Sequence, residues 1–268
     1  MTCAFHRFLL AYWGLIMSGE DKAVSLGYPS YVWRYGQDRR LALIRRYASL
    51  EGKRILDVGC GLGMYVKKIR AFSDQVYGID VDFDKLAEVR EALPNLGVAL
   101  AEALPFPDDS FDVVLLHEVI EHVGDDQQAV QEAYRVTRDK GRILIFAPNR
   151  LYPFETHGAY WRGEYHFGNI PLVNYLPDPL RRRFAPHVRA YTTRGLRRLF
   201  DGLDCRIVVH TQIYPGYDKV AARWPRLASI LRRITYALEK TPLRAFGLSH
   251  FLVVEKRTGA CISRPFLL

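Results

Sequence analysis

The fold of this chain follows from Arg54-Ile-Leu-Asp-Val-Gly-Cys-Gly-Leu-Gly-Met-Tyr65. Residues 55–58 predict a buried strand, and the glycines at 59, 61 and 63 predict a tight turn directly after it. A helix is expected to begin near Gly63, because apolar residues recur beyond it at helical spacing. Glycines in such a turn let a ligand approach the backbone and the N–H groups of the helix N-terminus. Alone, this pattern is equally typical of an ordinary strand-to-helix turn, and its spacing differs from the dinucleotide-binding fingerprint.

A second element makes the pattern specific. Gln75-Val-Tyr-Gly-Ile-Asp-Val-Asp82 predicts another short apolar strand, which ends in the acid Asp80 about 20 residues after the first glycine. A carboxylate at that position is suited to bind both hydroxyls of a ribose. The order strand, glycine turn, helix, strand and acid therefore predicts a site for a nucleoside cofactor.

Three stretches carry a resemblance to a known family: Ile55 to Gly63, Gly78-Ile-Asp80, and Ala101-Glu-Ala-Leu-Pro-Phe-Pro-Asp-Asp-Ser-Phe-Asp112. Together they resemble the class I S-adenosylmethionine-dependent methyltransferases. The similarity is greatest to the small-molecule branch that includes the ubiquinone and menaquinone biosynthesis methyltransferases. It covers about residues 50–150 and is loose outside that window.

Strands and helices are expected to alternate through this region. Further strands are expected at 97–103, 111–116 and 141–146, with helices over 83–93 and 127–138. Such alternation predicts a parallel sheet whose ligands bind at the carboxyl ends of the strands. The predicted fold class is α/β: a Rossmann-like, doubly wound, mostly parallel seven-stranded sheet with an aromatic-rich cap inserted after the fifth strand.

The expected organisation has five parts. An N-terminal helical segment at 1–50 precedes a cofactor-binding core at 51–149, an inserted cap at 150–192, the completion of the sheet with a basic amphipathic helix at 193–257, and a tail at 258–268. The cap is rich in rings and prolines and is where we expect the substrate pocket. Tyr35 or Arg39 is a candidate to touch the cofactor, although simple packing of their helix is favoured. The later helix, over 219–238, is expected to pack on the core, with binding to an anionic membrane as the alternative.

The resemblance assigns the cofactor-binding residues by position. The family's first motif matches Asp57, Gly59, Cys60, Gly61 and Gly63, and its ribose-binding acid matches Asp80 with Val81 beside the adenine. Ala101 and Glu102 match the adenine-edge segment, and His117 and Glu118 would lie on the same edge of the sheet. The chain departs from the family at Leu100, where an acid is usual. Loss of that one polar contact would cost about 1 kcal/mol of cofactor affinity.

Methyl transfer from a sulfonium requires an aligned and often deprotonated nucleophile. His157 is the first candidate for the general base, with His187 second, and His117 is a third candidate for a catalytic role. If residues 117–122 are helical, Glu118, Glu121 and His122 share one face and form a candidate site for Mg²⁺ or another divalent cation. The same pattern resembles the metal ligands of ubiquinone-pathway O-methyltransferases and of small-RNA 2′-O-methyltransferases. In the RNA group another histidine completes the site, and His157 or His187 is a candidate for that place here. It also occurs in metal-free relatives, where these residues only anchor the loop.

Charge is unevenly distributed along the 268 residues. Residues 1–149 carry 18 basic and 21 acidic side chains, a net of −3, whereas residues 150–268 carry 20 basic and 8 acidic, a net of +12. A basic half of this kind suits an anionic substrate, a membrane surface or nucleic acid, or is simply solvated surface. The four cysteines show no paired spacing, which indicates a reducing compartment and no zinc site.

The apolar run at 8–17 is too short to span a bilayer and lacks the flanks of a signal peptide. We therefore expect a cytoplasmic protein, with peripheral membrane contact as an option and translation starting at Met1 or Met17.

These observations predict an enzyme that transfers a methyl group from S-adenosylmethionine to a small or lipid-like acceptor at a hydroxyl oxygen. Two alternatives remain: an RNA 2′-O-methyltransferase, for which the sequence shows no RNA-binding module, and a non-catalytic protein that binds S-adenosylmethionine. Nucleic acid is the less favoured partner, and the sequence sets no oligomeric state.

Overall fold

The computed structural model describes residues 32–257. The predictions for the segments before and after this range, which include the two candidate start sites and the C-terminal tail, lie outside the described residues.

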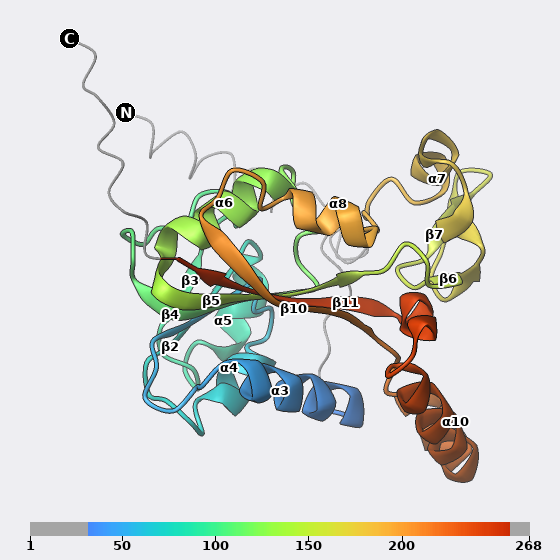
Figure 1. Ribbon diagram of the computed structural model, residues 1–268, viewed down its shortest axis with the longest axis horizontal. Helices are drawn as coiled ribbons and strands as arrows, with labels where there is room; N and C mark the ends of the chain where they lie inside the picture. Colours follow the sequence, from blue (N-terminus) through green and yellow to red (C-terminus); the bar gives the residue numbers. More distant parts are fainter. Residues whose placement is uncertain (1–31, 258–268) are drawn as a thin grey trace.

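One seven-stranded sheet organises the described chain (Figure 1), in the order β10-β11-β5-β4-β1-β2-β3. Neighbouring strands are parallel except around β11, which runs antiparallel to both β5 and β10. The strands are β1 Ile55–Val58, β2 Val76–Asp80, β3 Leu96–Val98, β4 Phe111–His117, β5 Thr137–Pro148, β10 Cys205–Ile213 and β11 Ser249–Lys256. The strand order reverses between β1 and β4, and this is where open α/β sheets bind their ligands.

Helices cover both faces of the sheet and make three layers. One face carries α3 (Tyr35–Tyr47), α4 (Met64–Ile69) and α5 (Phe83–Val89), and the other carries α6 (Asp126–Val136) and α8 (Thr193–Arg198). The two buried clusters follow this division, since Ile44 and Val66 belong to one and Ala129 and Leu196 to the other. Because both faces are covered, β1 is buried at all four positions, as expected for a central parallel strand.

Local sequence explains where these helices begin. The side chain of Asp125 accepts a hydrogen bond from the Gln128 N–H and caps α6, and Thr192 caps α8 in the same way. Gly63 begins α4 with a positive φ of 65°, a conformation that only glycine adopts at little cost.

Two expectations for the core were wrong. The third strand ends at Val98 instead of Ala103, because the chain leaves the sheet edge there and continues as a turn. Residues 118–124 form a turn and not a helix, and Glu118 has a positive φ of 56°. The helical face that was to present Glu118, Glu121 and His122 together does not exist.

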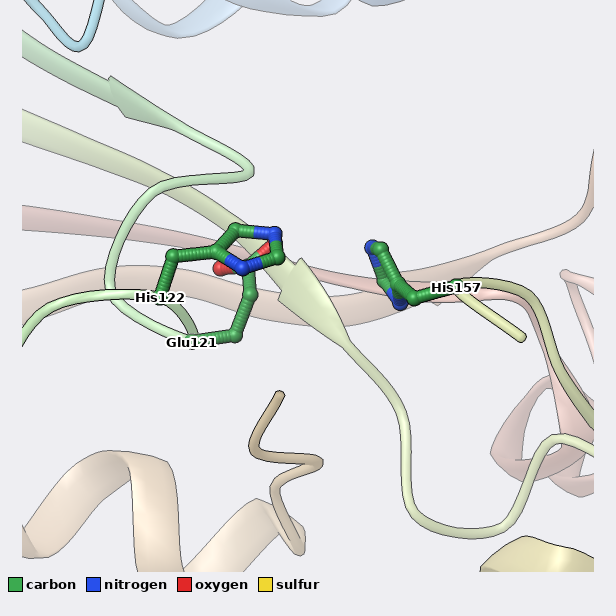
Figure 2. Close-up of side chains that lie close together, drawn as sticks. All are labelled: Glu121, His122 and His157. Atoms are coloured by element: carbon green, nitrogen blue, oxygen red, sulfur yellow. The ribbon is translucent and has the colours of Figure 1, made fainter. Parts of the chain in front are cut away.

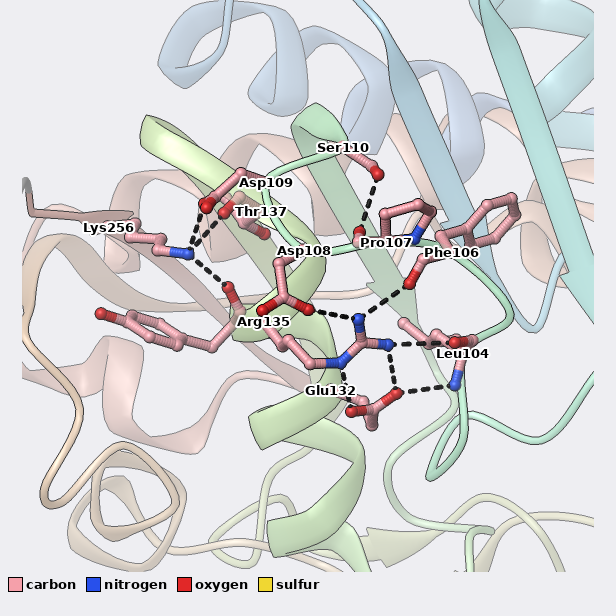
Figure 3. A network of polar contacts seen from close by, with 11 residues as sticks. Leu104, Phe106, Pro107, Asp108, Asp109, Ser110, Glu132, Arg135, Thr137 and Lys256 are labelled. Carbon is pink, nitrogen blue, oxygen red and sulfur yellow. Dashed lines mark hydrogen bonds and ion pairs between the residues drawn. The ribbon is translucent and has the colours of Figure 1, made fainter. Parts of the chain in front are cut away.

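A polar network fixes the loop between β3 and β4 (Figure 3). Arg135 on α6 donates to the carbonyls of Leu104 and Phe106 and pairs with Asp108 and Glu132. Glu132 in turn accepts from the Leu104 N–H at 2.8 Å. These bonds give hydrogen-bond partners to backbone groups of a loop that pairs with no strand, and they hold the loop beside α6.

The predicted cap is a small unit after β5. It comprises β6 (Phe154–Glu155), β7 (Ala159–Trp161), β8 (Glu164–His166), β9 (Ile170–Pro171), η1 (Val173–Tyr175) and α7 (Asp178–Phe184). Two antiparallel pairs, β6 with β9 and β7 with β8, pack around their own apolar cluster. A buried ion pair between Glu155 and Arg181 at 2.6 Å joins the first strand of the cap to its helix.

The amphipathic helix predicted over 219–238 is two helices, α9 (Asp218–Arg223) and α10 (Pro225–Leu238), with a break at Trp224. Pro225 causes the break, because it has no N–H and suits only the first turn of a helix. The favoured expectation that its apolar face packs on the core was wrong for much of that face, because Ala228 is the one fully buried residue of α10. A short η2 (Pro242–Phe246) leads from α10 back to β11. Among the described helices, none is long and apolar enough to cross a membrane.

Candidate cofactor and acceptor site

A cavity of about 410 Å³ opens at the carboxyl ends of β1, β2 and β4, where the strand order reverses. The glycine turn, the end of β2, helix α3, the start of β11 and the cap all contribute to its wall. The lining residues are Gln37, Arg40, Asp57, Gly59, Cys60, Gly61, Leu62, Met64, Tyr65, Asp80, Lys85, His117, Glu118, His122, Pro148, Thr156, His157, Leu248 and Ser249. The end of β4 contributes as well, so residues from six separate parts of the sequence meet at one site.

The glycine turn and Asp80 are bonded to each other. The Gly61 N–H donates to one carboxylate oxygen of Asp80 at 2.7 Å, and the Asp82 N–H donates to the other at 2.9 Å. Gly59 has a φ of 70°, and a Cβ there would lie 2.4 Å from a methyl of Val119. A Cβ on Gly61, by contrast, would meet nothing within 4 Å, so the backbone of the turn faces open space. This exposed backbone, beside a fixed carboxylate, is suited to a nucleoside ligand.

Asp57 lies at the base of the cavity and is almost fully buried. Burial, reinforced by the nearby charge of Asp80, raises its pKa to about 8. A buried carboxylate of this kind favours a cationic ligand group, because burial removes the water that would stabilise its negative charge and the cation stabilises it instead.

Arg40 organises the opposite wall. Its guanidinium donates to Glu118 and to the Nε2 atom of His117, both at 2.7 Å, and to the Ser249 hydroxyl at 2.9 Å. Burial and the charge of Arg40 lower the pKa of His117 to about 3, so this ring is neutral and its Nε2 accepts. Burial alone would raise the pKa of Glu118, but Arg40 outweighs it and holds that pKa well below its usual range. His117 is therefore a fixed acceptor for Arg40 and not a general base.

The side chains of Glu121, His122 and His157 approach one another on the cap side of the cavity (Figure 2), with candidate ligand atoms within 4.8 Å of one another. Both carboxylate oxygens of Glu121 and the Nδ1 atom of His122 are buried without a hydrogen-bond partner. Burial, followed by the charge of Glu118, raises the pKa of Glu121 well above its usual value. Burial also lowers the pKa of His122 to about 4, helped by the neighbouring His157 and His187. One member of the predicted trio is corrected, because Glu118 pairs with Arg40 instead. Of the two histidines expected as candidates to complete the group, His157 lies beside Glu121 and His122.

His157 is held by the cap. Its backbone N–H and its Nδ1 atom both contact Oε1 of Glu155 at 3.0 Å, and Arg181 binds the other oxygen of the same carboxylate. Burial would raise the pKa of Glu155, but the hydrogen bond from His157 and the charge of Arg181 lower it to about 2. An ionised Glu155 accepts, so Nδ1 carries the proton and Nε2 keeps a free lone pair. His187 contacts the His157 carbonyl through Nε2 at 3.2 Å and supports it from behind, without lining the cavity.

Comparison with known proteins shows which family this part of the chain matches. Residues 56–145, which hold the glycine turn, Asp80 and β4, match a family model described as a methyltransferase domain. This region is a class I S-adenosylmethionine-dependent methyltransferase domain. A probable S-adenosylmethionine-dependent methyltransferase of Mycolicibacterium smegmatis is 36% identical over 140 residues, which are 51% of this chain and 53% of that protein. A ubiquinone biosynthesis O-methyltransferase of Pseudomonas putida is 34% identical over 121 residues, 41% of this chain and 51% of that protein.

The fold of the methyltransferase domain is also that of solved structures. An S-adenosylmethionine-dependent methyltransferase from Mesorhizobium loti superposes with a TM-score of 0.57 at 21% identity, over 81% of this chain and 96% of that one. Against the curated relatives the chain spans only about half of their length. The family model itself matches residues 56–145, and the cap and α10 lie outside that range.

The predicted cofactor residues divide into two groups in the methyltransferase domain. Asp57, Gly59, Cys60, Gly61, Asp80, His117 and Glu118 line the cavity. Four others lie outside its described lining: Gly63, Val81, Ala101 and Glu102. Glu102 turns its carboxylate to the N–H groups of Gly124 and Asp125 and fastens the loop before α6. Their assignment to the adenine side stays a prediction.

The sequence interpretation missed the contribution of α3. Gln37 and Arg40 line the cavity, whereas the suggested Arg39 pairs with Glu239 and Tyr35 lies under Arg232. Periodicity does not separate these arginines, because adjacent residues on a helix differ by about 100° in direction and only the packing partner selects one. Glu155 was missed as well, although its place two residues before His157 is a signal for a local carboxylate–histidine contact.

Proposed function

We propose that this protein is an S-adenosylmethionine-dependent methyltransferase that acts on a hydroxyl of a small or lipid-like acceptor. The observation that carries the proposal is the match of residues 56–145 to the methyltransferase family, together with a cavity that the glycine turn and Asp80 line within that range. The ribose and amino-acid ends of the donor would lie along Asp80 and Asp57. The acceptor would enter between the donor and the cap.

The proposed reaction is an in-line displacement. The acceptor oxygen forms a bond to the methyl carbon as the bond from carbon to sulfur breaks, and S-adenosylhomocysteine leaves. The hydroxyl proton goes to Nε2 of His157, whose ring is oriented by the Glu155 carboxylate. The positively charged sulfonium becomes a neutral thioether, and the positive charge is then carried by the protonated imidazole of His157, so the net charge is unchanged.

The cofactor half is tested by calorimetric titration with S-adenosylhomocysteine. The wild type is expected to bind saturably, and Asp80→Asn to bind at least tenfold more weakly, about 1.4 kcal/mol. Asp74→Asn is the matched control, because it makes the same change in an exposed turn. Absence of binding by the folded wild type would refute the proposal.

The acceptor half is tested by turnover against a panel of phenols, quinols and lipid-linked sugars. His157→Gln is expected to lower kcat by a factor of about 10² to 10⁴, the range for loss of a general base. His166→Gln changes an exposed histidine of the same cap and should leave kcat unchanged. Equal rates for His157→Gln and the wild type on a good acceptor would remove His157 from the chemistry.

We further propose that Glu121, His122 and His157 hold a divalent cation. The buried oxygens of Glu121 and the buried Nδ1 of His122 lack partners, and one oxygen and two imidazole nitrogens are a donor set that Zn²⁺ or Mn²⁺ accepts. Because Nδ1 of His157 faces Glu155, the cation would occupy the Nε2 lone pair, so this arrangement is an alternative to His157 as general base. In it the cation would act as a Lewis acid and lower the pKa of the acceptor hydroxyl. The competing arrangement is a protonated Glu121 that donates to Glu118.

Calorimetry with Mn²⁺ and with Zn²⁺ decides between the two arrangements. If the cation site exists, the wild type binds one ion, and the affinity of His122→Ala for that ion is lower by a factor of at least about ten, in the range for loss of a metal contact. His210→Ala, at a half-buried histidine on β10, serves as the control. Retained ion binding in His122→Ala, or none in the wild type, favours the protonated pair.

A further inference from the structure

The outward side of α10 carries an apolar stripe. Leu227, Ile230 and Ile234 are 45%, 55% and 54% exposed, and Trp224 at the helix break is 54% exposed. Steps of three and four residues place them on one side of the helix. Single exposed apolar residues need no explanation, but four large ones in a row indicate a binding surface.

A basic row runs beside the stripe. Arg226 and Arg233 are exposed and seven residues apart, two helical turns, and Lys240 continues the same line just past the helix end. The acidic side chains of this segment, Asp218 and Glu239, lie on the side that faces α3. Asp218 accepts from the Gly36 N–H and pairs with Arg232, while Glu239 pairs with Arg39 and accepts from the Tyr214 N–H. The outward side of α10 is thus apolar and cationic, with its carboxylates facing α3.

Segments next to α10 in the chain reach the cavity. Leu243 and Phe246 of η2 are exposed, and Leu248, two residues further on, lines the cavity. Lys219 of α9 lies over the ring of Phe167 in the cap, 5.7 Å from its centre. Figure 1 shows α10, η2 and the cap together beyond one end of the sheet.

We propose that the α10 stripe and its basic row bind the surface of an anionic lipid bilayer. Apolar side chains enter the boundary between headgroups and acyl chains, while arginine and lysine reach the anionic headgroups along their flexible stems. A second copy of this chain is a poor occupant, because it would bring two basic rows together. The surface would present the cavity to acceptors held in the bilayer, a point that rests on the proposed function, whereas the binding itself does not.

The test is flotation of the full chain with vesicles, without cofactor or acceptor. Vesicles of phosphatidylcholine mixed with phosphatidylglycerol are compared with vesicles of phosphatidylcholine alone. We expect the wild type to float with the anionic vesicles and at least tenfold less with the neutral ones. Salt should weaken the binding, since the attraction to headgroups is screened.

Two variants separate the parts of the surface. Ile230→Ser with Ile234→Ser removes apolar area without touching a buried residue, and Arg226→Glu with Arg233→Glu reverses the basic row. Each pair is expected to lower partition into anionic vesicles at least tenfold. The matched control is Arg194→Glu with Arg198→Glu, which makes the same change in net charge on exposed residues of α8. It should keep most of the binding.

Three outcomes would overturn the proposal: no flotation of the folded wild type, equal loss of binding in the α8 control, or unchanged binding in both α10 variants. A mass that rises with concentration in light scattering, and falls in the Ile230/Ile234 variant, would assign the stripe to self-association and also overturn it. Because no turnover is measured, these results are independent of the titration with S-adenosylhomocysteine.

Discussion

Single side chains of the site are set by their neighbours more than by their own type. His117 and His157 are both histidines facing one cavity, yet Arg40 occupies Nε2 of the first, whereas Glu155 contacts Nδ1 of the second and leaves its Nε2 available for the proposed proton transfer. The carboxylates divide in the same way. Arg40 keeps Glu118 ionised, whereas burial favours the protonated form of Asp57 and of Glu121.

Asp57 makes cofactor binding depend on pH. Its pKa is raised to about 8, so most of the free protein carries a proton there at neutral pH, and binding a cationic amino group must expel it. The affinity for S-adenosylhomocysteine is therefore expected to rise about tenfold per pH unit up to about pH 8. Calorimetry in buffers of different ionisation enthalpy counts the proton released. Asp57→Asn should bind weakly at every pH, and a wild-type affinity that does not change with pH would contradict this account.

Arg40 is expected to be needed for cofactor binding although it lies outside the methyltransferase match. Arg40→Gln removes the guanidinium that pairs with the Glu118 carboxylate. It also removes a contact that holds the backbone of Glu118 at its positive φ. We expect binding of S-adenosylhomocysteine to weaken by about tenfold, or 1.4 kcal/mol. Arg46→Gln, on the same helix but exposed, is the control. If both substitutions weaken binding equally, the effect belongs to the helix and not to the site.

At the scale of elements, the cap depends on one buried ion pair. Glu155 and Arg181 are both almost fully buried and join β6 to α7, and Arg181 also donates to the Val188 carbonyl. Such a pair adds little over an apolar contact, but removal of one partner leaves a buried charge uncompensated.

Glu155→Gln is therefore expected to lower the free energy of unfolding by about 3 kcal/mol, measured with urea at neutral pH. The folded pKa of Glu155 is depressed from 4.5 to about 2, so its contribution is complete above the unfolded value and is lost as the pH falls towards 2. The difference between variant and wild type should shrink over that range. Asp178→Asn breaks an exposed pair of the same cap and should cost less than about 1 kcal/mol. Equal losses for the two variants would show that Glu155 is not a buried anchor.

At the scale of the whole molecule, the cap, the core and the C-terminal strands are fastened at Asn149 and Tyr191. The Asn149 side chain donates to the carbonyls of Ala245 and Gly247, and the Tyr191 hydroxyl lies within hydrogen-bond distance of both the Ile120 carbonyl and the Asp126 carboxylate. The cavity wall comes from all of these parts, so a ligand in it should stabilise them together.

Saturating S-adenosylhomocysteine is accordingly expected to raise the melting temperature as one transition. At a hundredfold excess over Kd the gain is about 2.7 kcal/mol, which corresponds to roughly 5 to 10 °C for a chain of this size. Scanning calorimetry with and without ligand measures the shift, and Asp80→Asn should show a smaller one. Two transitions, of which only one moves, would mean that the cap unfolds independently of the cofactor site.

The order of elements in the core was predictable from the sequence because its signals are local. Residues 55–58 form a strand at the expected bounds, and the glycine turn followed by Asp80 indicated the cofactor class, since backbone conformation and strand polarity depend on nearby residues. Glu118, Glu121 and His122 were placed on a helix by their spacing alone. The structure makes that segment a turn, because Arg40 and Ser249, from distant parts of the chain, hold Glu118.

The sequence by itself determined the α/β sheet, the glycine turn and the acid at the end of β2. Only the tertiary structure decided which arginine of α3 faces the cavity, that His157 and not His187 joins Glu121 and His122, and that the stripe on α10 faces outward. These features depend on contacts between residues far apart in the chain, such as Arg40 with Glu118 and Arg39 with Glu239. A repeating pattern fixes which residues share a face of a helix, but the partner that covers the face is set by how the whole chain packs.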